Sequence, residues 1–75
     1  MITVPLTSHE ETILAMAQRA CLLSRGQWLS VRRLAIDSGP NCLQVMMRLS
    51  SLRVYEQAGM EVDRSSMFDV FVRVK

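Results

Sequence analysis

Residues 28–53 decide the fold, and they read WLSVRRLAIDSGPNCLQVMMRLSSLR. Ser30 is a favourable helix N-cap, and the apolar residues that follow it recur with a helical period. Asn41 can cap a second helix, and the glycine and proline just before it interrupt the period. The stretch therefore predicts two consecutive helices joined by a tight turn, over 30–38 and 41–53.

Each of these predicted helices has one apolar face and one outward face. The apolar face of the first contains Val31, Leu34 and Ala35, and that of the second contains Cys42, Val45, Met46, Leu49 and Leu52. The outward side of the second helix contains Gln44, Met47, Arg48 and Ser51. Apolar faces of this width pack against a core, so the outward residues are left for solvent or a partner.

Upstream, the residues Ser8 to Glu11 have the Ser-x-x-Glu form of a capping box and predict the start of a helix. Its apolar stripe includes Ile13, Leu14, Ala17, Ala20 and Cys21. Gly26 fits the position after the last helical turn, which predicts a helix over about 8–25. Residues 27–29 are then interpreted as an extended stretch that carries Trp28 inward, as a core residue beneath the C-terminal segment.

Downstream, the period changes from helical to alternating at Val54, which predicts a β-hairpin over 54–75. A three-residue loop at 64–66 would pair apolar residues on one face, with Val62 opposite Phe68, Met60 opposite Val70 and Ala58 opposite Val72. Phe71 falls on the other face, where a lone aromatic side chain needs a covering surface. We therefore expect Phe71 to take part in dimerisation.

The whole chain, 1–75, is accounted for as one α+β domain of three helices, a short strand and a hairpin. Apolar residues make up 49% and charged residues 21% of the 75, which is the composition of a globular protein. No apolar run approaches the ~20 residues of a membrane span, and the first residues resemble no export signal, so we expect a cytoplasmic protein without a membrane partner.

Charge and cysteine content restrict the function further. The net charge is only +2, yet eight of the nine basic residues are arginine, which binds phosphate and guanine edges through a planar fork. An arginine preference on a solvated surface explains the same composition equally well. Cys21 and Cys42 stand apart with His9 as the lone histidine, so no zinc site can be assembled from thiolates and imidazole, and no metal or cofactor is expected.

The segment 28–39 resembles the opening of many winged helix-turn-helix regulators: an apolar strand residue (Trp28), a Ser/Thr cap (Ser30), a Leu-Ala pair (Leu34, Ala35) and then glycine. Among these it is most similar to the small enterobacterial activators of carnitine operons and virulence islands (CaiF/GrlA-like), with phage and plasmid regulators close behind. The resemblance implies a winged helix-turn-helix transcriptional regulator that binds duplex DNA, with 41–53 as recognition helix and 63–67 as wing tip.

On this interpretation the middle of the recognition helix reads bases and arginines around it bind phosphates. The candidate base-reading residues are Asn41, Gln44, Arg48 and Ser51, and the candidate phosphate ligands are Arg32, Arg33, Arg53 and Arg64. Because 41–53 is poor in basic residues, we expect weak intrinsic affinity. Arg48 and Arg64 are equally consistent with solvated surface residues.

A second interpretation is a winged-helix module that binds protein, or an anti-repressor, without affinity for DNA. It is favoured by the low net charge, by the acidic residues Glu61, Asp63 and Asp69 in the hairpin, and by the outward position of Met47. An enzyme is not expected, because the chain has no glycine-rich phosphate loop and little volume for a catalytic pocket.

Overall fold

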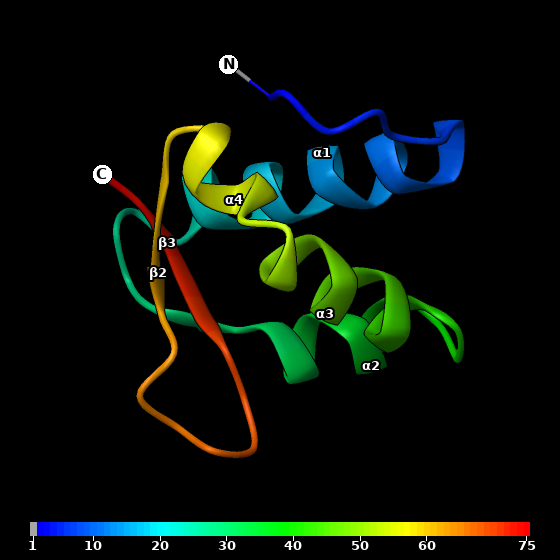
Figure 1. Ribbon diagram of the computed structural model, residues 1–75. Helices are drawn as coiled ribbons and strands as arrows, with labels where there is room; N and C mark the ends of the chain where they lie inside the picture. The colour runs from blue at the N-terminus through cyan, green and yellow to red at the C-terminus, as the bar shows by residue number, and fades with distance from the viewer. Residues whose placement is uncertain (1) are drawn as a thin grey trace.

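A computed structural model describes residues 2–75, which form an α+β domain with four helices and a three-stranded antiparallel sheet. The elements are α1 (Ser8–Leu23), β1 (Leu29–Ser30), α2 (Val31–Ser38), α3 (Cys42–Ser51), α4 (Val54–Gln57), β2 (Met60–Asp63) and β3 (Phe71–Val74). The strand order is β1-β3-β2. Figure 1 shows β2 and β3 to one side of the helices, with the loop between them projecting away from α1. Within residues 2–75, no helix has the length and apolar character needed to cross a membrane.

The helices and the sheet enclose one apolar core, and the stripes predicted from sequence lie in it. The buried helical residues are Ile13, Leu14, Ala17 and Cys21 of α1, Val31 and Ala35 of α2, and Cys42, Met46 and Leu49 of α3. From the C-terminal segments come Val54, Tyr55, Met60, Val70 and Val72. Both cysteines are free and buried, in agreement with their places in the predicted apolar stripes.

The first helix begins at Ser8 as predicted, but its N-cap is Thr7, one residue before the predicted capping residue Ser8. The capping box is formed by Thr7 and Glu10: the Thr7 hydroxyl accepts from the Glu10 amide at 3.1 Å, and the Glu10 carboxylate accepts from the Thr7 amide at 2.9 Å. Ser8 and Glu11 have the same spacing but lie inside the helix and exposed. The predicted box was therefore wrong by one residue, because the two overlapping Ser/Thr-x-x-Glu patterns are equivalent on paper.

The predicted end of this helix was also too late. α1 ends at Leu23 with Ser24 as C-cap, and Arg25 and Gly26 both have positive φ, 56° and 86°. The left-handed conformation that the glycine was expected to supply thus begins one residue before it, at an arginine.

The predicted core position of Trp28 was wrong. Its side chain is 40% exposed, and the Arg73 guanidinium lies over the indole ring, 4.4 Å from the ring centroid. Arg73 is in turn held by Glu61, which accepts from its Nε at 2.7 Å. Trp28 therefore packs on the outer face of the sheet through a cation–π contact, while Val72 and Val70 fill the core.

A short fourth helix follows α3 where sequence predicted a strand. α3 ends at Ser51, Arg53 turns the chain with a φ of 58°, and Val54–Gln57 form one helical turn. This turn buries Tyr55 completely, and the phenol donates to the Met46 carbonyl at 3.0 Å. Burial raises the pKa of the Tyr55 hydroxyl well above its ordinary value. Four residues are too few to show a helical period, so pattern alone could not find α4.

The hairpin is confirmed, but its register and loop were wrong. Val62 pairs with Val72 and Met60 with Val74, four residues further along β3 than predicted, so residues 64–70 are a seven-residue loop. An even shift leaves the residues of β2 and β3 on their predicted faces, which is why the alternation within the strands was correct and the pairing was not. Phe71 is partly buried in the sheet, paired with Ser30 and Asp63.

The position of the capping box can be tested with two neighbouring substitutions. Thr7→Ala removes the acceptor at the N-cap and should lower the free energy of unfolding by about 1 kcal/mol, measured by urea denaturation. Ser8→Ala should change it by less than about 0.5 kcal/mol, because Ser8 is exposed inside the helix. Equal losses for the two variants would contradict the assignment.

Candidate nucleic-acid interface

The polar residues predicted on the outward side of α3 do lie together. Asn41, Gln44, Arg48 and Ser51 are all exposed, at the three- and four-residue spacing that places them in one row along the helix. Asn41 is the N-cap residue, as predicted, but its side chain makes no capping bond. We call these four residues the α3 row. They present amide, guanidinium and hydroxyl groups, which are the groups that pair with base edges.

Arg48, the cation of the α3 row, forms an ion pair with α1. Its Nη1 lies 3.1 Å from Glu10 Oε2, and the Arg48 side chain remains 63% exposed while that of Glu10 is 7% exposed. The Thr7 amide donates to the Glu10 carboxylate and holds its pKa below the ordinary value of 4.5. Arg48 lowers this pKa further, and both effects act against burial, which raises it. No local sequence pattern indicates this pair, which joins residues 38 positions apart.

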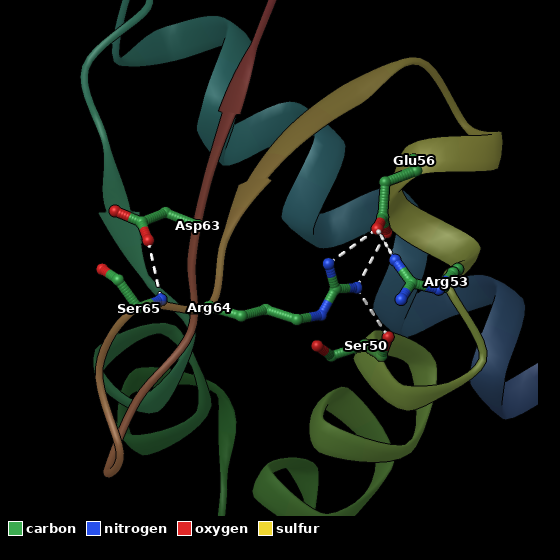
Figure 2. A network of polar contacts seen from close by, with 6 residues as sticks. All are labelled: Ser50, Arg53, Glu56, Asp63, Arg64 and Ser65. Atoms are coloured by element: carbon green, nitrogen blue, oxygen red, sulfur yellow. Dashed lines mark hydrogen bonds and ion pairs between the residues drawn. The ribbon is translucent and has the colours of Figure 1, made fainter.

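Arg64 was expected at the tip of the hairpin, pointing outward. Its side chain instead points back into the domain. Its guanidinium donates to the Glu56 carboxylate at 2.7 and 2.9 Å and to the Ser50 carbonyl at 2.8 Å. Figure 2 shows the side chain reaching from the end of β2 to α4 and to the last turn of α3. These bonds lower the pKa of Glu56 and raise that of Arg64, in both cases against partial burial. Arg64 is thus a structural anchor of the loop.

The far end of the loop is anchored to the start of α2. Arg32 donates to the Phe68 carbonyl through Nε at 3.0 Å and Nη2 at 2.8 Å. The Asp69 carboxylate accepts from the Ser30 hydroxyl and from the Arg32 amide. Burial acts to raise the pKa of Asp69, but its bonds to Ser30 and to the Arg32 and Val70 amides outweigh it, and the pKa lies below 3.8. Loop 64–70 is therefore held at both ends.

Arg33 and Arg53, the two remaining predicted phosphate ligands, are more available. Arg33 is 80% exposed and lies 3.8 Å from Asp37, one helical turn on. Arg53 is exposed and lies 3.4 Å from Glu56. Exposed pairs of this kind contribute only about 0.2–1 kcal/mol, so a phosphate can replace the carboxylate at small cost.

The anchored loop presents two exposed apolar side chains, Met67 and Phe68, and the predicted inward position of Phe68 opposite Val62 was wrong. Met67 is 91% and Phe68 76% exposed, because the true register places Phe68 in the loop and not in the strand. The Asp63 carboxylate accepts from the Ser65 amide at 2.8 Å and the Ser66 hydroxyl from the Phe68 amide at 3.2 Å, so the tip has its own local bonds. Met67 and Phe68 together form what we call the loop tip.

Comparison with known protein families, curated proteins and solved structures finds no match to this chain. The features that bear on its function are therefore the α3 row, the exposed arginines beside it and the anchored loop.

The anchoring role of Arg64 predicts a stability effect. Arg64→Ala removes three hydrogen bonds of a charged group and should lower the free energy of unfolding by about 1–2 kcal/mol, measured by urea denaturation. Arg33→Ala is the matched control and should change it by less than about 0.5 kcal/mol, because that side chain is exposed. Equal effects of the two substitutions would mean that Arg64 does not anchor the loop.

The lowered pKa of Glu56 predicts acid sensitivity. A carboxyl with a lowered pKa in the folded state contributes stability that is present above its ordinary pKa of 4.5 and is lost as the pH falls through the folded value. The free energy of unfolding should therefore fall more steeply below about pH 4.5 in the wild type than in Glu56→Gln. Parallel pH profiles of the two proteins would contradict this role.

Proposed function

We propose that this chain is a winged helix-turn-helix domain that binds duplex DNA, with α3 as recognition helix and loop 64–70 as wing, and that it acts as a transcriptional regulator. The observation that carries the proposal is the α3 row: four exposed polar residues on a helix that is packed against α2 across a turn of three residues. A helix with this support can enter a major groove without losing its contacts to the core.

The order of the elements supports the proposal. A helix and a short strand are followed by α2 and α3, then by the single turn α4 and the β2–β3 hairpin, whose second strand pairs with β1. In a helix-turn-helix, the second helix of the pair is offered to the groove while the first crosses the backbone. α2 and α3 are consecutive helices joined by a turn of three residues, and the hairpin comes after them in the chain, which is the order of elements that this arrangement requires.

The charges predict weak, salt-sensitive binding. Arg48 and Arg64 are paired with carboxylates, and Arg32 donates to a carbonyl, so of the predicted DNA-binding arginines Arg33 and Arg53 are the exposed ones with only weak partners. For each phosphate that the protein neutralises, the slope of log affinity against log salt concentration becomes more negative by about 0.9. With two to four phosphates contacted, we expect a slope of about −2 to −4.

A protein partner is the second candidate, and the loop tip favours it. Two large apolar side chains are exposed on a loop that is held at both ends, and such a feature is costly unless something covers it. In that case the domain would bind a protein through Met67 and Phe68 and would have no affinity for DNA. The two candidates differ in their affinity for duplex DNA, which a single binding experiment measures.

We expect the purified protein to bind a fluorescein-labelled duplex of random sequence, measured by fluorescence anisotropy over a salt series, with the slope given above. Arg33→Ala should reduce the magnitude of that slope by about 1, since one phosphate contact is lost. Gln44→Ala should leave the slope unchanged, because an amide releases no counterion.

The matched control is Arg19→Ala, an exposed arginine on the side of α1 opposite its buried stripe. It should leave both affinity and slope as in the wild type. An absence of binding at the lowest salt concentration would reject the DNA-binding proposal and favour the protein-binding candidate.

A further inference from the structure

The two carboxylate oxygens of Glu10 have separate partners. Oε1 accepts from the Thr7 amide at 2.9 Å, which completes the capping box of α1. Oε2 lies 3.1 Å from Nη1 of Arg48 on α3. The carboxylate is almost completely buried, so it acts on these two groups and is shielded from solvent.

The cap alone does not require the second contact. One oxygen satisfies the Thr7 amide, and a capping glutamate at a helix surface can leave the other to water. Here the other oxygen is directed at the one cation of the α3 row. Arg48 is also not buried by the pairing, since 63% of its side chain is exposed. The pair therefore fixes one end of a guanidinium that otherwise faces outward.

A guanidinium has five N–H donors in a rigid plane, and two of its edges can form a fork. The closest approach of Glu10 to Arg48 is at Nη1. Among residues 2–75, no other group bonds to Nε or Nη2 of Arg48. The edge formed by Nε and Nη2 is the one left open, and it is the kind of edge that donates to the two acceptors of guanine, O6 and N7.

We propose that Glu10 is a positioning residue for Arg48, and that it makes Arg48 a reader of guanine and not a phosphate ligand; this inference rests on the proposed DNA-binding function. Two physical effects act in the same direction. The contact immobilises a long side chain before binding, so its conformational entropy is not lost in the complex. The buried negative charge also offsets the positive charge of Arg48, which weakens its attraction to phosphate but leaves its hydrogen-bond donors in place.

The test is selection of bound sequences from a library of randomised duplex DNA, with sequencing of the bound fraction. The wild type should enrich guanine at one fixed position, and Arg48→Ala should lose that enrichment. Glu10→Gln, which keeps the shape of the side chain but not its charge, should reduce the guanine enrichment about 3- to 10-fold, the cost of immobilising one long side chain during binding. Its affinity for random duplex should stay the same or rise.

Glu11→Gln is the matched control, since Glu11 is the exposed neighbour in the same helical turn, and it should select sequences as the wild type does. If Arg48→Ala loses the guanine preference and Glu10→Gln keeps it, the positioning role is wrong. If the wild type binds no duplex at all, the proposed function itself fails, and the two failures are thus distinguishable.

A second measurement uses the unmodified protein and covers the case in which Glu10→Gln does not fold. The ¹⁵N order parameter of the Nε–H group reports how rigid an arginine side chain is on the picosecond to nanosecond timescale. Arg48 should have a clearly higher value than Arg33, although both are largely exposed. Equal values would overturn the inference, because Glu10 would then hold nothing in place.

Discussion

The guanidinium of Arg64 joins three segments that are distant in sequence, and the orientation of the loop depends on it. It bonds to Glu56 on α4 and to the Ser50 carbonyl at the end of α3, and it leaves the end of β2 as loop 64–70 begins. A domain of this size buries too little apolar surface to orient a seven-residue loop by packing alone. Charge-assisted bonds take that role, and Arg32 and Asp69 repeat it at the other end.

Because these arginines bond within the protein, they are not available as direct phosphate ligands. A basic side chain on an exposed segment is a natural candidate for phosphate binding, and Arg32 and Arg64 were expected to act in this way. Their guanidiniums are instead bonded within the protein, so any contact they make with a ligand comes through the loop they position. Of the predicted DNA-binding arginines, Arg33, Arg53 and the open edge of Arg48 remain directed outward, which concentrates the proposed contacts on α2, α3 and the residue that follows the end of α3.

Periodicity was sufficient for the faces of the three longer helices, although not for the cap and end of α1 or for the short α4. The Ser30 cap is present, with its hydroxyl accepting from the Arg33 amide at 3.1 Å, and the buried stripes of α1, α2 and α3 are those expected from periodicity. The α3 row also follows from spacing alone. The other errors concern long-range pairing: the hairpin register, which an even shift leaves indistinguishable by face, and Trp28, which lies under the guanidinium of Arg73. The partners of Arg48 and Arg64 lie in other elements, and no local pattern specifies them.

The central claim is that the α3 row and the anchored loop form one binding surface for duplex DNA. Titration of the ¹⁵N-labelled protein with an unlabelled random duplex, followed by amide chemical shifts, tests this most directly. The account predicts the largest shift changes at Gln44, Arg48 and Ser51 and within loop 64–70, with little change at Leu22 and Leu23 at the end of α1. Changes centred on the end of α1, or none at low salt, would contradict it.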